Sequence, residues 1–363
     1  MTKQQNYSRR VKRLKFILPL VALALLLAIV LLGEQEIEVA DLPFDYQKIE
    51  LTRKGPLMRE PELRGRNSAG TPYEVVAELA RPDPNNENIV YLQDVKGVLF
   101  SPDNTETRRM TAPNGVLQRQ NDQLYLTGGV RLTDWRGFEM TSPTMNIDFR
   151  TEIATTQSEV VAAQENSRIV AGSMNANAVN ETLYFFNGAT TTHIPPQNKT
   201  QNKTQNKTQS SSSPDTKEAG FQTDPSAPIV TSAQDLSLNQ KTLLAIYQGG
   251  VDTVQGPMSL RSARLALTFN EQKELQTLRA EQNVELRDTD GTIARGDWAE
   301  HHIDSGEIFM GGAQGSEVTL IDGGNILRGT SLRVDTATGK AILTGGTEAE
   351  NSQRVRGIFT PGQ

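Results

Sequence analysis

The amino-acid sequence predicts an all-β protein built from a repeated hairpin. A first phrase, in which a hydrophobic strand leads into a glycine pair, occurs as LYLTGGV at Leu124–Val130 and LAIYQGGV at Leu244–Val251. A second phrase follows roughly 15–20 residues later, in Met140–Asp148 and Leu260–Leu267, and it returns in Leu327–Asp335. A unit of roughly 30 residues buries its apolar face only against its neighbours. We therefore expect a stack of β-hairpins joined by glycine turns.

Alternation and turn residues support this fold class. In the second phrase Met145, Ile147 and Phe149 fall on one face of a strand, and Asn146 and Asp148 fall on the other. Clusters of Gly, Pro and Asn separate the short apolar runs, a spacing typical of an all-β sandwich or a barrel-like fold.

Composition narrows the possible functions. Of 363 residues, 36% are hydrophobic and 6% aromatic, which suits thin, elongated β-layers better than a thick globular core. The formal net charge of -6 argues against a nucleic-acid partner. The chain has no cysteine, so disulfides, thiolate metal sites and thiol redox motifs are excluded.

An uncharged apolar run near the N-terminus predicts a membrane anchor. Residues 16–32 carry no charge, and with Leu14 they nearly span the ~30 Å hydrocarbon core of a bilayer. Basic residues precede this run and glutamates follow it, which predicts a cytoplasmic tail at 1–13 and a transmembrane helix at 14–32. The alternative is a cleaved signal peptide. The run is longer than a typical signal-peptide core, and Glu38–Ala40 is a poor cleavage site.

The remaining chain divides into two β domains and a tether. The first domain is expected at 46–195 and the second at 229–350, with a loose tail at 351–363. Between them, 196–228 contains Gln-Asn-Lys-Thr three times, then serines and prolines, which predicts a disordered linker. The asparagines of this repeat match the glycosylation acceptor pattern, but repeat expansion in a flexible tether explains them as well.

No catalytic constellation emerges. The sequence has no phosphate-binding loop, no Gly-x-Ser-x-Gly elbow and only three histidines. His301 and His302 are adjacent, so on a strand they point to opposite faces and do not easily share a metal ion. Asp297, Glu300 and Asp304 could be imagined as a site with His302, but a solvated strand beside a turn accounts for this group. We expect no enzyme activity, no metal and no cofactor.

An anchored pair of β domains without catalytic residues suggests binding or conveying a cargo. An amphipathic cargo needs an apolar path, because an acyl chain in water costs about 0.8 kcal/mol per CH₂ group. Inward apolar faces of the hairpin stack, left open along one side, would form such a trough; a closed sandwich core would use the same residues. The candidate groove residues are Leu124, Leu126, Met145, Ile147, Phe149, Leu236, Leu238, Leu244, Ile246, Leu265, Leu267, Phe269, Leu332 and Val334.

These features resemble two families of one export machine. A basic N-terminus and an anchor, followed by Leu124–Leu132 and Met140–Asp148, look like LptC, the inner-membrane-anchored lipopolysaccharide export protein. The second domain, with Tyr247–Asp252, Leu260–Leu265 and Leu327–Asp335, is similar to the OstA-like domain of LptA, the soluble bridge. The chain departs from the LptC pattern, in which the anchored protein carries one such domain, because it joins two by a tether.

The resemblance implies a fold, a cargo and partners. The fold would be two twisted β-jellyrolls after one transmembrane helix, each open along one side, with lipid passing between the sheets. The domains would be periplasmic, and lipopolysaccharide would arrive from the permease subunits of an inner-membrane ABC transporter. It would leave toward a periplasmic bridge protein or an outer-membrane receptor. The alternatives are an anchored β-repeat scaffold for structure or adhesion and, less favoured, an anchored carbohydrate-active enzyme.

Open jellyrolls have unpaired strand edges, and such edges add partner strands. The last strand of the first domain and the first strand of the second flank the tether, so we expect them to pair with each other. A strand near the C-terminal end would then remain as the outgoing edge. The candidate edge-pairing residues are Leu183, Phe185, Leu236 and Leu343.

Overall fold

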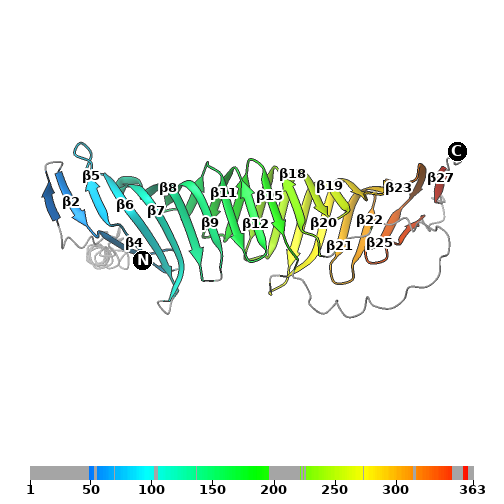
Figure 1. Ribbon diagram of the computed structural model, residues 1–363, viewed down its shortest axis with the longest axis horizontal. Helices are drawn as coiled ribbons and strands as arrows, with labels where there is room; N and C mark the ends of the chain where they lie inside the picture. Colours follow the sequence, from blue (N-terminus) through cyan, green and yellow to red (C-terminus); the bar gives the residue numbers. More distant parts are fainter. Residues whose placement is uncertain are drawn as a thin grey trace, which may run out of the picture.

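The computed structural model describes residues 49–345 and 355–358, except 53–54, 69, 102–104, 136, 196–220, 222–223, 225, 273 and 314–315. Apart from the short 3-10 turn η1 (Arg119–Asn121), the regular structure described is all β. The strands pair into one hydrogen-bonded sheet, drawn out into the long stack of Figure 1. The all-β prediction is therefore confirmed.

The strands are numbered along the chain from the N-terminus. They are β1 (Ile49–Thr52), β2 (Gly55–Arg59), β3 (Glu62–Arg66), β4 (Pro72–Val76), β5 (Leu79–Pro82), β6 (Ile89–Phe100), β7 (Glu106–Gln118), β8 (Gln123–Asp134), β9 (Glu139–Asp148), β10 (Ile153–Thr156), β11 (Val160–Gln164), β12 (Ser167–Ala171), β13 (Ser173–Asn177), β14 (Thr182–Phe186), β15 (Ala189–His193), β16 (Ile229–Ala233), β17 (Asp235–Asn239), β18 (Leu244–Gln255), β19 (Met258–Phe269), β20 (Leu275–Arg287), β21 (Ile293–His302), β22 (Glu307–Gly311), β23 (Val318–Asp322), β24 (Asn325–Gly329), β25 (Ser331–Asp335), β26 (Ala341–Thr344) and β27 (Arg356–Ile358).

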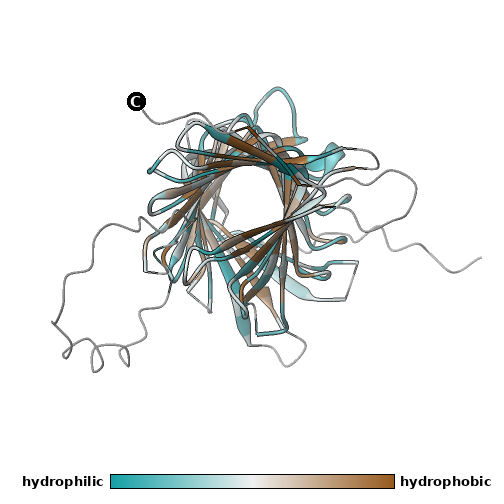
Figure 2. Cartoon of the chain, turned by 90° about the vertical axis from the view of Figure 1, so that its right-hand side faces the viewer, coloured by the Kyte–Doolittle hydropathy of each residue, from teal (hydrophilic) through white to brown (hydrophobic). Residues whose placement is uncertain are grey.

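The sheet is folded lengthwise into two leaves. One half of β6 pairs with β5 and its other half with β4, and β9 is shared in the same way between β10 and β11. The first leaf contains β1, β2, β5, β10, β13, β14, β17, β22, β25 and β26. The second contains β3, β4, β11, β12, β15, β16, β23, β24 and β27, while β6–β9 and β18–β21 give one half to each leaf. Viewed end-on, the strands surround the long axis of the stack (Figure 2).

The glycine pairs lie within strands, not between them. Gly128–Gly129 falls inside β8 and Gly249–Gly250 inside β18, at register shifts where each strand passes from one leaf to the other. All four glycines have positive φ, between 79° and 102°, which L-residues rarely adopt. The prediction of glycine turns at these positions was wrong. A β-bulge and a tight turn both require positive φ, so the same residue type marks either one.

The two predicted domains share one ladder. β14 pairs with β17, placing Phe185 opposite Leu236, and β15 pairs with β16, placing Thr191 opposite Thr231. Both leaves therefore continue from the first domain into the second without a break in main-chain hydrogen bonding. The chain forms one continuous folded sheet across its two domains.

Two predicted boundaries differ from the structure. Phe221 lies within the range predicted as a linker, yet it is fully buried in the hydrophobic core. β27 lies within the tail predicted to be loose, yet it pairs with β24, with Ile358 opposite Ile326. Composition did not predict either feature. A single buried aromatic residue, or a strand of three residues, changes the average composition of a polar segment too little to be noticed.

The predicted cytoplasmic tail and membrane anchor, 1–13 and 14–32, lie outside the described residues. Within the described part of the chain, no helix has both the length and the apolar character needed to cross a bilayer.

The alternation at the domain junction predicts contrasting stability effects for two adjacent phenylalanines. Phe185 is 0% exposed and faces the interior, whereas Phe186 is 37% exposed on the outer face of β14. We expect Phe185→Ala to lower the free energy of unfolding by about 3–5 kcal/mol, because it leaves a cavity between the leaves. Phe186→Ala is expected to cost less than about 1 kcal/mol. Urea unfolding followed by circular dichroism measures both, and equal losses would contradict this assignment of faces.

Candidate functional site

The first leaf carries two inward rows of side chains that run across the strands. The bend is the line along which β6–β9 and β18–β21 pass from one leaf to the other. The row nearest to it, called here the bend-side row, consists of cross-strand neighbours that are mostly apolar. Its members are Ala80, Leu92, Gly115, Leu126, Met145, Thr156, Met174, Phe185, Leu236, Tyr247, Leu265, Ala280, Ala299, Met310, Leu332 and Leu343. It passes through the domain junction without interruption.

The second row of the first leaf, the outer inward row, lies two residues farther from the bend. It contains Val90, Leu117, Leu124, Ile147, Ala154, Ala176, Leu183, Leu238, Ala245, Leu267, Leu278, His301, Ile308, Val334 and Ala341. His301 is its single polar member.

The second leaf also has two inward rows. The one nearer the bend includes buried Val130, Ala189 and Val251, and the one farther from the bend is called here the opposing row. It contains Leu63, Val75, Gly97, Met110, Leu132, Met140, Ala162, Ile169, Thr191, Thr231, Thr253, Leu260, Leu286, Ala294, Leu320 and Leu327. Three threonines stand together at the domain junction, and every other member is apolar. The rows of both leaves bound an apolar trough along the stack.

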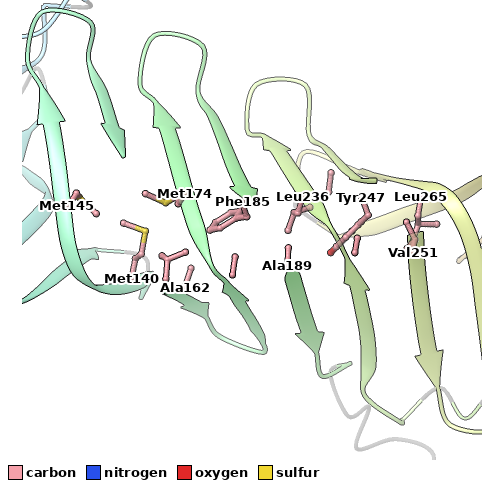
Figure 3. Close-up of a cluster of buried hydrophobic side chains, with 14 of the residues drawn as sticks. Met140, Met145, Ala162, Met174, Phe185, Ala189, Leu236, Tyr247, Val251 and Leu265 are labelled. Carbon is pink, nitrogen blue, oxygen red and sulfur yellow. The ribbon is translucent and has the colours of Figure 1, made fainter. Parts of the chain in front are cut away.

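Burial within the trough varies along both rows of the first leaf, and Leu124 and Val334 of the outer inward row are as buried as the bend-side residues. Leu126, Phe185 and Leu265 on the bend-side row are completely buried, while Ile147 and Leu267 on the outer inward row are partly exposed and pack against the core. Figure 3 shows side chains from both leaves meeting in the space between them, in the region that includes the domain junction. The trough is therefore closed by its own side chains along much of its length, and it is less tightly covered at places such as Ile147 and Leu267.

The sequence placed most of the candidate groove residues on the inward side. Leu124, Leu126, Met145, Leu236, Leu265, Leu332 and Val334 belong to the buried core, and Ile147, Phe149, Leu238, Leu267 and Phe269 pack against it. The candidate edge residues also lie on inward rows. Leu183 and Phe185 face Leu238 and Leu236 across the junction, while Leu343 lies on β26, which pairs with β25 and with no other described strand.

Leu244 and Ile246 lie on the outer face of β18, so their assignment to the groove was wrong. On β18 the buried residues are Ala245 and Tyr247, which lie opposite Leu238 and Leu236 on β17. Both faces of this part of β18 carry apolar residues. The more hydrophobic pair, Leu244 and Ile246, was predicted to face inward, but it faces outward. The register with β17 determines the face, and a sequence read strand by strand does not contain that register.

The interior of the second domain contains a cavity of about 60 Å³. It is lined by Ile229, Thr253, Gln255, Met258, Ser259, Leu260, Leu278, Leu286, Ala299, His301, Ile303 and Ile308. Burial, with a smaller contribution from the charge of neighbouring His302, lowers the pKa of His301 to about 4. His301 is therefore neutral near pH 7 and contributes an uncharged ring to the apolar wall. His302, on the opposite face, lies 3.0 Å from Glu300 (Nε2 to Oε1).

Hydroxyl groups meet inside the trough at the domain junction. The Tyr247 hydroxyl on the first leaf lies 2.7 Å from Thr191 Oγ1 on the second, and Thr231 Oγ1 lies 3.1 Å from Thr253 Oγ1. Burial raises the pKa of Tyr247 to about 12, so its phenol stays protonated. The sequence analysis missed these residues because threonine and tyrosine are common on any strand face.

The described residues hold no group of three or more His, Asp or Glu arranged to bind a metal ion. The carboxylate of Asp297, one of the residues considered above for a site, accepts a hydrogen bond from the main-chain N–H of Ala313.

Comparison with known families divides the chain at the same junction. Residues 20–194 match the family described as lipopolysaccharide-assembly, LptC-related, and residues 230–340 match the LptA/(LptD N-terminal domain) LPS transport protein family. The chain is an LptC-like lipopolysaccharide transport protein with a second, LptA-like domain. The LptC-like region ends one residue after β15, and the LptA-like region begins within β16.

A solved structure similar to this chain is LptH of Pseudomonas aeruginosa, described as the LptA homologous periplasmic component of the conserved lipopolysaccharide transport device. It is 18% identical with a TM-score of 0.32, and the match covers 37% of this chain and 96% of LptH. No curated protein matches this chain.

His301 makes stability depend on pH. In the unfolded chain a histidine has a pKa near 6.5, whereas in the folded chain His301 has a pKa of about 4. The unfolded state therefore binds a proton more readily in this window, and the free energy of unfolding falls as the pH falls from about 6.5 to about 4. The expected loss from His301 is about 3 kcal/mol.

The measurement compares urea unfolding at pH 7 and pH 4.5 for the wild type and two variants. His301→Leu, which suits the apolar row, is expected to remove this part of the pH dependence, while His302→Gln on the outer face retains it. If His301→Leu loses as much stability on acidification as the wild type, His301 does not titrate in the folded state as described.

Proposed function

We propose that this chain takes lipopolysaccharide from an inner-membrane ABC transporter and passes it along its trough toward the outer membrane. Membership of the two transport families makes it a periplasmic component of lipopolysaccharide transport. The single observation that carries the rest is the continuity of the inward rows across the junction of β14 with β17 and β15 with β16. One chain thereby offers an apolar path through two domains.

The physical argument rests on the cost of exposing acyl chains. Each methylene group moved from an apolar environment into water costs about 0.8 kcal/mol, so a carrier must offer apolar contacts along its whole length. Strands spaced about 4.8 Å apart give the rows a length on the order of 70 Å. Such a path requires no bond-breaking residues, in line with a carrier and not an enzyme.

The order of the regions gives the path a direction. The LptC-related match begins within the apolar segment at 14–32, which we propose is a single transmembrane helix with the 1–13 tail in the cytoplasm. Lipopolysaccharide would then enter the LptC-like region from the permease subunits. It would leave the LptA-like region for a bridge protein or an outer-membrane receptor.

Photo-crosslinking tests the trough with neighbouring residues as controls. A crosslinking amino acid at Met145 or Leu265, which face inward, is expected to capture lipopolysaccharide from cells carrying the full-length protein. The same group at Asn146 or Ala266, one residue along each strand on the outer face, is expected to capture at least several-fold less. Equal capture on both faces, or none on either, would favour the alternative of an anchored scaffold without lipid cargo.

The outgoing edge at β26 gives a second test. Asp335 N donates to Lys340 O, so by antiparallel alternation the N–H of Leu343 points away from β25. Leu343→Pro removes this donor and is expected to block addition of the next partner's strand while β25 stays paired. Leu343→Ala loses the side chain but keeps the N–H, so it is expected to bind the partner almost normally. Pull-down of the bridge protein or receptor measures this, and equal loss in both variants would contradict strand addition at β26.

A further inference from the structure

The opposing row is polar at one place only. Along the whole second leaf its members are apolar, except for Thr191, Thr231 and Thr253 on β15, β16 and β18. These three strands are neighbours at the junction of the LptC-like and LptA-like regions. On the first leaf, Tyr247 brings a fourth hydroxyl to the same place. We call these four residues the hydroxyl belt.

Packing alone does not require hydroxyl groups here. Valine has the shape and nearly the volume of threonine, and apolar residues fill most equivalent positions elsewhere in the rows. One other pair of buried hydroxyls, Ser142 and Thr156, lies 3.0 Å apart in the LptC-like region, but it stands alone and does not continue across neighbouring strands. A hydroxyl inside an apolar interior is unfavourable unless it is hydrogen-bonded, and the belt meets this demand within itself. Thr231 pairs with Thr253, and Thr191 pairs with Tyr247. Side chains of the belt therefore satisfy one another.

The bond between Tyr247 and Thr191 joins the two leaves. Tyr247 lies on the part of β18 in the first leaf, between Leu236 and Leu265, and Thr191 lies on β15 in the second. At 2.7 Å the bond spans the trough and leaves no room for an acyl chain between the two side chains. In Figure 3 Tyr247 lies between Leu236 and Leu265 in the row of buried side chains that passes along the trough.

Beyond the belt lies the cavity of the LptA-like region. Thr253 belongs both to the belt and to the cavity wall, and Leu260, the next member of the opposing row, also lines the cavity. The belt therefore separates the interior of the LptC-like region from the cavity that follows. An acyl chain that travels between them must first separate Tyr247 from Thr191.

We propose that the hydroxyl belt is a gate between two lipid-holding compartments, with the Tyr247–Thr191 bond as its latch. This inference rests on the proposed function. Methylene groups offer no hydrogen bond, so the latch stays broken while an acyl chain occupies the junction and forms again when the chain has passed. The gate slows exchange in both directions alike. Net direction comes from the transporter and not from the latch.

The test follows lipopolysaccharide past the gate in time. Crosslinking groups at Ile147, before the belt, and at Leu278, in the cavity wall after it, report arrival in the full-length protein reconstituted with its transporter and ATP. Tyr247→Phe and Thr191→Val each remove the latch and keep the shape of the side chain. Each is expected to speed arrival at Leu278 relative to Ile147 roughly five-fold, the factor that corresponds to one net hydrogen bond.

Matched controls come from the outer faces of the same region. Thr190→Val removes a hydroxyl that lies 3.2 Å from Ser232 Oγ outside the trough, and Tyr184→Phe alters an exposed tyrosine of β14. Both are expected to leave the relative rate unchanged. Thermal unfolding of every variant reports whether the fold is kept.

The outcomes distinguish failure of the proposed transport function from failure of the gate. If the wild type captures lipopolysaccharide at neither position, the proposed function fails before the gate is tested. If it captures at both and the latch variants match the controls, the function stands and the gate is overturned. If both latch variants unfold, or hinder arrival at Leu278, the bond only holds the leaves together and the gate is likewise overturned.

Discussion

Each long strand that crosses the bend, β6–β9 and β18–β21, has to keep its apolar residues inward on both sides of it. A slip of one residue in a strand turns its whole apolar set toward water, so the register at the bend determines whether a trough exists. The register shifts between Gln248 and Val251 of β18, and between Arg261 and Arg264 of β19, lie at this place. The extra residues absorb the change of direction, and the inward rows of both leaves remain aligned.

The bend also explains where sequence reading succeeded and where it failed. On β19 the inward residues are Met258 and Leu260 before the bend but Leu265 and Leu267 after it, so the inward face changes from even to odd positions. Within one leaf, alternation predicted the faces of β9 and β19 correctly. Across the bend no single alternation holds, because a bulge shifts the count by one residue. The glycine pairs correctly indicated positions with positive φ. We assigned these positions to hairpin turns, whereas they are bulges within strands.

The contents of the interior were only partly predictable. Long aliphatic runs identified the bend-side and outer inward rows, but on β18 two apolar faces competed and hydrophobicity chose Leu244 and Ile246 over Ala245 and Tyr247. His301 and the hydroxyl belt were missed because their meaning depends on what lies opposite them. A threonine on an isolated strand is unremarkable, whereas three in one row facing a buried phenol are not. That row is assembled from strands on both sides of the tether.

Continuity at the junction and a gate within it meet different requirements of transport. The ladder between β14 and β17 and between β15 and β16 is made by main-chain groups, which lie in the sheet and leave the trough free. Aliphatic side chains alone would make the interior uniform, so a lipid would be held no more firmly in one region than in another. A latch of side-chain hydroxyls opens without disturbing that ladder, because its bond lies across the leaves and not within them. The main chain therefore holds the two domains together while side chains at the same strands control what passes between them.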